Sequence, residues 1–396
     1  MPLNPLVFQK SHKSEAIVIG IDASRNRSGG ARAYLNGILA ELDPLKYGIR
    51  EVHLWAYKAL LCSIPDRPWL IKHNPKELEQ GLPSQLWWQA TRLSEELIHS
   101  GCNILFTTDA STLCRFKPMV VLSQDMLSYE PGVMRYFGYT KARLRLLALL
   151  LLQNRAFQSA EGVIFLTRYA AKVIQKSCGT LPRVVCIPHG VGEEFRRTKA
   201  LQGWPEPGER PIRCVYVSNA EMYKHQWVVV RAIEALRKCG YNITLTLVGG
   251  GAGRAQELLD EQLAISDPEK AFIFQLDFLP HQELPLHLAC ADIFVFASSC
   301  ENMPITLVEA MAVGLPIASS NRGPMPEVLG DGGVYFDPKD ADSIANAVEQ
   351  IIKDPMLRLA VANRAKVLSA QYSWSRCANE TFTFISETYR SIRQRI

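Results

Sequence analysis

The chain has 396 residues, of which 47% are hydrophobic and 21% charged, a composition typical of a globular protein with two domains. Its ten cysteines stand singly and its histidines show no metal-ligand spacing, so we expect neither disulfides nor a metal site. Because Met1–Lys13 contains no apolar run, we expect no secretory signal and a cytoplasmic protein. The net charge of +5 divides into +10 for residues 1–200 and −5 for the rest, which predicts an anionic partner for the first half, and no nucleic-acid motif accompanies it.

Apolar strand-like runs alternate with helical stretches through the first half of the chain. The first run, Glu15–Asp22, ends shortly before Ser28-Gly29-Gly30, and a helix is expected over Ala31–Leu42. Further strands are expected at Asn103–Thr107, Met119–Leu122, Gly162–Leu166 and Val184–Ile187, and further helices at Ser84–His99 and Lys141–Gln158. Continuous apolar strands between helices predict a parallel sheet that is covered on both faces.

A stretch rich in proline and glycine, residues 201–211, is typical of a linker. The alternation then restarts, with strands expected at Arg213–Val217, Ile243–Val248, Phe272–Leu276, Asp292–Phe296, Pro316–Ser319 and Gly333–Phe336. Helices are expected over Ala341–Asp354, Met356–Ala370 and Ser373–Ile396. The fold class is therefore α/β, with two tandem, doubly wound, Rossmann-like domains at residues 1–200 and 212–372 and a ligand-binding cleft between them. The last helix, 373–396, is a candidate for packing back on the first domain.

The segment from Phe294 to Gly314 carries the clearest chemical signal. A buried strand ends in small polar residues, and a helix is expected to begin near Pro304, with Asn302 suited to the N-cap. The free backbone N–H groups of Ile305 and Thr306 would lie at the positive end of this helix, which favours phosphate.

Two carboxylates flank this expected phosphate site, Glu301 in the loop before the helix and Glu309 about two turns inside it. A carboxylate beside a phosphate needs hydrogen-bond donors, and the hydroxyls of a sugar and a ribose are suitable. The pattern therefore indicates a nucleotide-sugar. The alternative is that Glu301 is a solvated loop residue and Glu309 an exposed helix residue.

Together with the Ala-Met-Ala-x-Gly-x-Pro run that follows, this pair of glutamates resembles the signature of the retaining glycosyltransferases of family 4, which have the GT-B fold. The resemblance covers most of the chain in order and spacing, at Ser28–Gly30, Ile187–Val191, Lys224, Val248–Gly251 and Gly323–Val328. It implies an acceptor-binding first domain and a second domain that binds a nucleotide-diphosphate-sugar. It also implies a glycan or lipid-linked hydroxyl acceptor in bacterial surface-polysaccharide synthesis, and no cofactor or metal.

The resemblance implies roles for individual residues. Glu301 would contact the donor-sugar hydroxyls at the reacting face, Glu309 the ribose hydroxyls and Lys224 the diphosphate. Gly29 and Gly30 would bring backbone N–H groups close to the phosphate or the acceptor from the opposite domain. Two glycines would line the base pocket, Gly249 and Gly250, although a plain strand-to-helix turn would explain them equally well. The loop that leads into the helix and the first helical residues complete the expected donor site: Asn302, Met303, Pro304, Ile305 and Thr306.

Three departures from the family pattern matter. Asn219 stands where an arginine of the diphosphate clamp is usual, so one expected positive charge is missing. Candidate replacements for this charge are Arg25, Arg27 and Arg322. Gln124-Asp125 stands where many members have His-Asp near the donor sugar, and both residues are candidate catalytic residues although glutamine cannot titrate. Pro304 takes a common glycine position and removes one backbone N–H.

The stretch after Thr140 combines Lys141, Arg143 and Arg145 with the apolar run Leu146–Leu152, which is too short to span a bilayer. One interpretation is a basic, apolar helix at an anionic membrane surface, which would place the protein peripherally on the inner face of the cell membrane. The interpretation that we favour for the leucines is a buried helix whose basic side chains reach solvent.

Other functions fit parts of the pattern. A nucleotide-sugar 2-epimerase shares the two-domain architecture, but the segment Glu301–Gly314 and the Gly29-Gly30 loop favour a transferase. A nicotinamide dehydrogenase fits less well, because no Gly-x-Gly-x-x-Gly follows the first strand. A catalytically degenerate assembly subunit gains support from Asn219 and Gln124.

Overall fold

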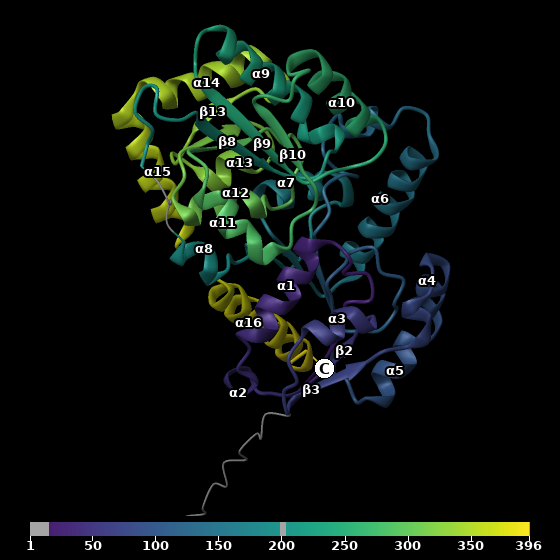
Figure 1. The fold of residues 1–396 in the computed structure, drawn as a ribbon. Coiled ribbons are helices and arrows are strands. Elements are labelled where there is room, and N and C mark those ends of the chain that lie inside the picture. Colours follow the sequence, from purple (N-terminus) through teal and green to yellow (C-terminus); the bar gives the residue numbers. More distant parts are fainter. Residues whose placement is uncertain (1–15, 199–202, 396) are drawn as a thin grey trace, which may run out of the picture.

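The computed structural model describes residues 16–198 and 203–395. The parts of the sequence predictions that fall on Met1–Lys13, Glu15, Leu201–Gln202 and Ile396 lie outside the described residues. The described chain folds into two α/β units, the first at the bottom and the second at the top of Figure 1.

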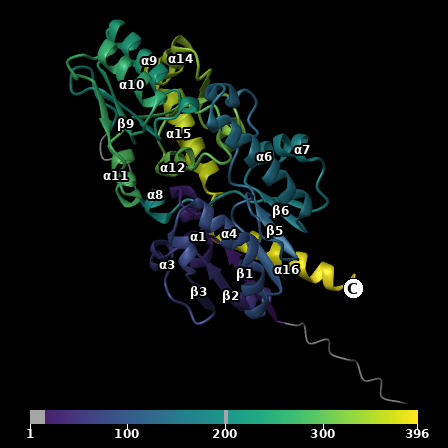
Figure 2. The ribbon, with the colours of Figure 1, turned by 90° about the vertical axis from the view of Figure 1, so that its right-hand side faces the viewer.

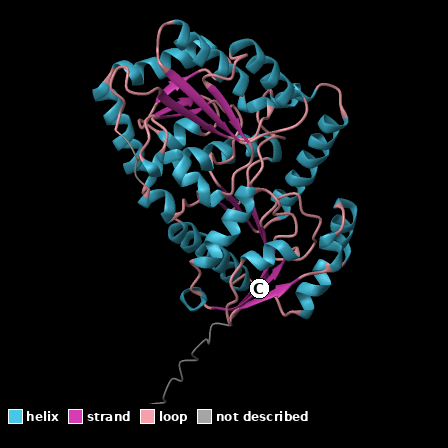
Figure 3. Ribbon diagram, viewed as in Figure 1, coloured by secondary structure: helices cyan, strands magenta, loops and turns pink. Residues whose placement is uncertain are grey.

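The first unit is built on a seven-stranded parallel sheet with the order β3-β2-β1-β4-β5-β6-β7. Its strands are β1 Ile17–Asp22, β2 Ile49–Trp55, β3 Leu70–His73, β4 Ile104–Thr107, β5 Met119–Leu122, β6 Gly162–Phe165 and β7 Val184–Cys186. All six residues of β1 are buried, because helices cover both faces of the sheet. Figure 3 shows these layers.

The second unit contains a six-stranded parallel sheet with the order β10-β9-β8-β11-β12-β13. Its strands are β8 Ile212–Val217, β9 Ile243–Val248, β10 Ile273–Leu276, β11 Ile293–Phe296, β12 Ile317–Ser320 and β13 Val334–Phe336. Each of these strands lies where the alternation in the sequence predicts it.

Helices and short 3-10 turns connect the strands of both units. In the first unit they are α1 Gly29–Ala40, α2 Pro44–Tyr47, α3 Lys58–Ser63, η1 Lys76–Glu79, α4 Leu82–Thr91, α5 Leu93–His99, η2 Val133–Phe137, α6 Lys141–Ser159, α7 Arg168–Cys178 and α8 Glu193–Arg197. In the second they are η3 Met222–Lys224, α9 Gln226–Lys238, α10 Arg254–Ser266, η4 His281–Glu283, α11 Leu284–Ala289, α12 Ile305–Val313, α13 Met325–Leu329, α14 Ala341–Lys353 and α15 Pro355–Ser369.

The last helix, α16 Trp374–Arg393, leaves the second unit and packs on the first, where it contacts α1, α2, β4 and β6. Figures 1 and 2 show it in yellow beside the purple elements of the first unit. The Tyr34 hydroxyl lies 3.3 Å from Thr381 Oγ1, and Val191 pairs with Ser373 where the chain crosses back. The second unit is therefore tied to the first at both of its ends.

The structure corrects the helix predicted over Ser84–His99, which is two helices separated at Arg92. The break lets Trp88 Nε1 donate to Glu96 Oε1 at 2.8 Å, whereas eight residues of a straight helix would rise by about 12 Å. Strands β2 and β3 were not predicted, because charged residues interrupt the first, and the second is an edge strand, Leu-Ile-Lys-His, with only its first residue buried.

The preferred interpretation of the leucine run, a buried helix, holds only in part, because Leu146 is buried and Leu149, Leu150 and Leu152 are half-buried, whereas the other leucines of the run are exposed. Leu144, Leu147 and Leu151 of α6 are 69%, 43% and 69% exposed. Only Leu146, Gln153, Ala156 and Phe157 of this helix are buried.

Candidate active site

A cavity of about 610 Å³ lies between the two units. Loops at the carboxyl ends of β1, β4 and β5 line it on one side together with α6, and the loop between β11 and α12 lines it on the other. Ligands of open α/β sheets bind at these strand ends. Of the predicted site residues, the cavity brings together Gly30, Gln124, Asp125, Glu301, Asn302, Met303 and Ile305.

The amino ends of two helices, α1 and α12, meet at this cavity. A Cβ added to Gly30 would lie 2.9 Å from Ile305 Cδ1, so the two helix starts are in contact across the cleft. Ser28 caps α1 through a hydrogen bond from Ala31 N to its Oγ, at 3.3 Å. No side chain caps α12, so the first N–H groups of α12, including those of Ile305 and Thr306, remain available to an anion.

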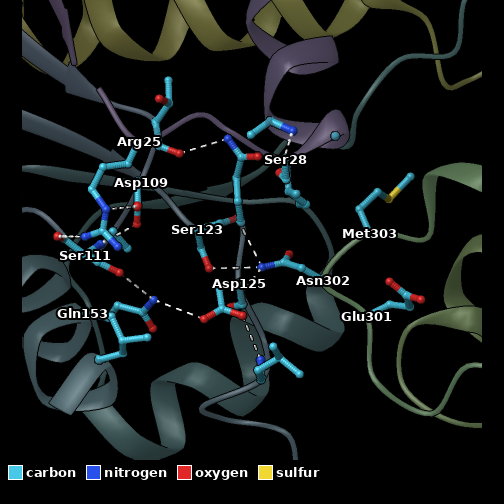
Figure 4. Close-up of a pocket in the computed structure, with 18 of the residues that line it drawn as sticks. Arg25, Ser28, Asp109, Ser111, Ser123, Asp125, Gln153, Glu301, Asn302 and Met303 are labelled. Atoms are coloured by element: carbon cyan, nitrogen blue, oxygen red, sulfur yellow. Dashed lines mark hydrogen bonds and ion pairs between the residues drawn. The ribbon is translucent and has the colours of Figure 1, made fainter. Parts of the chain in front are cut away.

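Asn302 does not act as the N-cap of α12, because Pro304 occupies that position and the Asn302 side chain extends into the first unit. Its Nδ2 donates to the backbone carbonyl oxygen and to Oγ of Ser123 at 3.2 and 3.3 Å. The backbone carbonyl oxygen of Asn302 accepts from Thr167 Oγ1 at 3.0 Å. Figure 4 shows Asn302 extending toward Ser123. Asn302 therefore joins the two units, a role that single-sequence patterns do not reveal.

Glu301 and Lys224 form an ion pair at the second-unit side of the cavity, and their side chains are 15% and 14% exposed. The carbonyl oxygen of Lys224 accepts from the Tyr216 hydroxyl at 2.7 Å, which fixes the turn η3 to β8. The Lys224 ammonium also lies 5.6 Å from the centre of the Phe296 ring. The residue predicted to bind the diphosphate, Lys224, therefore lies next to the residue predicted to bind the donor sugar, Glu301.

Gln124 and Asp125 lie on the opposite wall and are held by protein groups. Gln124 Nε2 donates to the carbonyl oxygen of Thr108 at 2.9 Å. Asp125 accepts from Leu127 N at 3.0 Å and from Gln153 Nε2 at 3.4 Å, and burial raises the pKa of its carboxyl. Figure 4 shows Asp125 and Gln153 facing one another on this wall.

Of the three arginines considered for the charge missing at Asn219, Arg25 alone lines the cavity among the described residues. Its Nε lies 3.3 Å from Asp109 Oδ2 and its Nη1 donates to the carbonyl oxygen of Ser111 at 2.9 Å. Arg27 points away and donates to Leu78 O at 2.7 Å, and Arg322 pairs with Asp337 at 2.7 Å beside a separate hollow.

Glu309 lies outside the cavity lining and is only 3% exposed. His281 Nε2 lies 2.7 Å from Glu309 Oε1, and the Phe195 ring meets the imidazole edge-on. The bond to Glu309 raises the pKa of His281, while burial raises the pKa of Glu309. No local sequence pattern indicates His281 as the partner of Glu309.

The remaining predicted donor residues lie at the ends of β8 and β9. Asn219 is exposed, and a Cβ on Gly249 would lie 2.6 Å from the carbonyl oxygen of Ser218. Gly249 has a φ of +110°, so a close approach and a turn both require glycine here. A Cβ added to Gly250 would lie 3.7 Å from Asp277 Oδ1, which is an ordinary contact distance. Together with Gly29, Lys224, Pro304, Thr306 and Glu309, these three residues are absent from the cavity lining.

Buried polar atoms without a hydrogen-bond partner belong to three side chains of residues that line this cavity. They are Oε1 of Gln153, both ring nitrogens of His189 and Oδ1 of Asn302, and all three side chains are nearly fully buried. Burial lowers the pKa of His189 to about 3, so its imidazole is neutral. A buried polar atom without a partner costs about 1–3 kcal/mol, so the cavity favours a ligand rich in hydroxyls.

Within residues 16–198 and 203–395, no group of three or more His, Cys, Asp or Glu side chains could hold a metal ion. In the same ranges no helix is sufficiently long and apolar to cross a membrane.

Comparison with a family model identifies the second unit. Residues 198–367 match the family "Glycosyl transferases group 1". This segment contains Lys224, Glu301, Glu309 and the whole of α12.

Curated relatives match in part. The O-antigen chain mannosyltransferase B of Escherichia coli is 33% identical over 120 residues, which are 30% of this chain and 32% of that protein. The GDP-mannose-dependent alpha-(1-6)-phosphatidylinositol monomannoside mannosyltransferase of Mycolicibacterium smegmatis is 29% identical over 221 residues, 51% of this chain and 56% of that protein. The chain thus spans about a third to just over half of the length of these relatives.

Solved structures match over nearly the whole chain. Sucrose-phosphate synthase from Thermosynechococcus elongatus has a TM-score of 0.72 at 16% identity and covers 96% of this chain and 100% of its own. HepE from Anabaena in complex with UDP-glucose has a TM-score of 0.66 at 18% identity and covers 92% and 99%. These matches confirm the predicted GT-B fold with its two parallel α/β sheets.

Proposed function

Because residues 198–367 match the family model of the glycosyl transferases group 1, we propose that the chain is a retaining glycosyltransferase that moves a hexose from a nucleotide-diphosphate-sugar to a hydroxyl acceptor. The observation that carries this proposal is the meeting of the α1 and α12 amino ends at one cavity, with Lys224 and Glu301 paired beside them. Amino ends of helices and a lysine are suited to a diphosphate, and a carboxylate is suited to sugar hydroxyls.

In this proposal the diphosphate binds at the first turn of α12 and draws Lys224 away from Glu301. Glu301 then accepts hydrogen bonds from the donor sugar. The bond between sugar C1 and the diphosphate oxygen breaks, the acceptor oxygen bonds to C1 from the same face, and its proton passes to the departing diphosphate oxygen. Lys224 and the helix end stabilise the charge that develops, and each such donor contributes about 3–4 kcal/mol to the barrier reduction.

The acceptor side is formed by the first unit. Asp125, Gln153, His189 and the Arg25–Asp109 pair surround the cavity there, and their polar atoms support a glycan or a lipid-linked sugar as the acceptor. The basic balance of residues 1–200 supports an anionic acceptor or an anionic membrane surface. The protein would then act in the cytoplasm in surface-polysaccharide or glycolipid synthesis, without a metal cofactor.

The test is a donor screen with purified protein. UDP-glucose and GDP-mannose are the first probes, because they appear in the names of similar proteins, and release of the nucleoside diphosphate and of the altered sugar is followed. We expect release from at least one donor, stimulated by an acceptor and abolished in Glu301→Gln. Conversion of the nucleotide-sugar without release would support an epimerase, and binding without turnover would support a degenerate assembly subunit.

A further inference from the structure

Helix α6 has two unlike faces. One face lines the cavity through Ala142, Arg145, Leu146, Leu149 and Gln153. The helix lies at the right-hand side of the molecule in Figure 1, the side that faces the viewer in Figure 2, and it has α7 and η2 as neighbours. Its other face is therefore directed away from the cavity.

This outer face carries a row of exposed leucines. Leu144, Leu147 and Leu151 follow a spacing of three and four residues, so they lie in line along the helix. Their exposed fractions are 69%, 43% and 69%. Exposed apolar side chains are common when they stand singly, whereas a continuous row marks an interaction surface.

Unpaired positive charge surrounds this row. Helix α6 contains Lys141, Arg143, Arg145 and Arg155, of which Arg145 belongs to the cavity-lining face, and it has no acidic residue. None of the four has a carboxylate partner within the described ranges. Just before the helix, Tyr139 is fully exposed, and its ring lies 5.2 Å from the Arg143 guanidinium.

We infer that the outer face of α6 is a membrane-docking surface that binds a bilayer containing anionic phospholipid. Leucines that enter the boundary between headgroups and acyl chains, flanked by basic residues and an interfacial tyrosine, match such a surface in chemistry and in sign of charge. A folded protein partner would need acidic groups spaced to match four cations on one helix, and no observation favours one. Because the opposite face of α6 lines the cavity, docking brings the cavity to the membrane, where a lipid-linked acceptor would be presented; this last step rests on the proposed function.

The test measures binding rather than turnover, so its result is independent of the proposed activity. Purified full-length protein is floated with vesicles of phosphatidylcholine alone and of phosphatidylcholine with phosphatidylglycerol. We expect flotation with the anionic vesicles that falls at high salt, and at least about tenfold weaker binding to the neutral ones, since each basic residue near the surface contributes about fivefold.

A matched pair of triple variants locates the surface. Leu144→Gln, Leu147→Gln and Leu151→Gln together should weaken binding to anionic vesicles by more than about tenfold. The control replaces three exposed apolar residues that are scattered over the molecule, Leu45→Gln, Ile98→Gln and Ile265→Gln, and should bind as the wild type does. All of these side chains are exposed, and circular dichroism with thermal melting verifies that both variants fold.

Three outcomes would overturn the inference. They are failure of the wild type to bind either vesicle, equal binding by the wild type and the α6 variant, and equal loss in the scattered control. A wild type that forms dimers, while the α6 variant is monomeric and neither binds vesicles, would show that the face pairs with a second copy of the chain instead.

Discussion

At the scale of single residues, the site depends on two opposite charges that form an ion pair. A bound donor would replace this ion pair by contacts of each residue with the donor. Lys224 and Glu301 share an ion pair, and both are mostly buried. A diphosphate would compete for the ammonium and leave the carboxylate to sugar hydroxyls. Asn302, which is bonded across the cleft, holds the loop between them and α12 in place.

Replacing Lys224 by glutamine should lower kcat for release of the nucleoside diphosphate by about 10²–10³-fold, because the departing charge loses its closest positive group. Initial rates at saturating donor measure this effect. The matched control is Lys238→Gln, which removes an exposed lysine paired with Glu234 within α9 and should leave kcat unchanged. A loss below about tenfold in the Lys224 variant would remove this residue from the proposed role.

His281→Gln should reduce stability in a pH-dependent way. Glu309 raises the pKa of His281 above its ordinary value of 6.5, so the folded protein holds this proton more tightly than the unfolded chain. The contribution is complete below pH 6.5 and is lost as the pH rises through the folded-state pKa. The melting temperature of the wild type should therefore exceed that of the variant more at pH 6 than at pH 8.5. A difference that grows with pH would contradict the account.

At the scale of elements, three helix starts organise the cleft. The starts of α1 and α12 are in contact across the cavity. The start of α7 is capped from the other unit, because both oxygens of Glu327 accept backbone N–H groups, from Arg168 and Tyr169, at 2.8 Å each. A carboxylate at the amino end of a helix is favourable, so this contact stabilises α7 and the closed arrangement of the units together.

Glu327→Ala should lower the free energy of unfolding by about 0.5–2 kcal/mol, the usual range for loss of an N-cap, and should increase cleavage at the unit boundary by a protease. Thermal melting and limited proteolysis follow the two effects. The control Glu380→Ala removes a carboxylate that pairs with Arg376 within α16 and should change neither by a comparable amount. Equal behaviour of the two variants would show that the cap does not hold the units together.

The sequence predicted most elements and part of the site, for reasons that differ between residues. Strand β11 of the second sheet is a continuous apolar run, whereas β2 begins with Ile-Arg-Glu and was not predicted. Glu301 and Lys224 were assigned to the same donor through the family resemblance, and no local spacing brings them together. The partners Ser123 of Asn302 and His281 of Glu309 are set by tertiary packing, 179 and 28 residues away, and no local pattern encodes them.

At the scale of the whole molecule, α16 ties the second unit back to the first where the chain crosses. Gly190 permits this crossing, since a Cβ there would lie 2.3 Å from the backbone nitrogen of Trp374. The two units are therefore linked through 198–203 and again at Ser373, which limits how they move relative to one another.

Gly190→Ala should destabilise the protein by about 1–3 kcal/mol, because the added methyl group meets backbone that cannot rotate away. Differential scanning calorimetry would show a lower melting temperature. Gly203→Ala, which adds a methyl group with nothing within 4 Å, is the control and should stay within about 0.5 kcal/mol of the wild type. A Gly190 variant as stable as the control would show that the crossing is not tightly packed.

The central claim is that a donor diphosphate binds at the amino end of α12, between Lys224 and the start of α1. The most direct measurement is a crystal structure with the nucleoside diphosphate that raises the melting temperature most. The account predicts diphosphate oxygens within hydrogen-bond distance of Lys224 Nζ and of the Ile305 and Thr306 backbone N–H groups, with the Lys224–Glu301 pair opened. A nucleotide bound outside this cleft, or a diphosphate that leaves the pair intact, would contradict it.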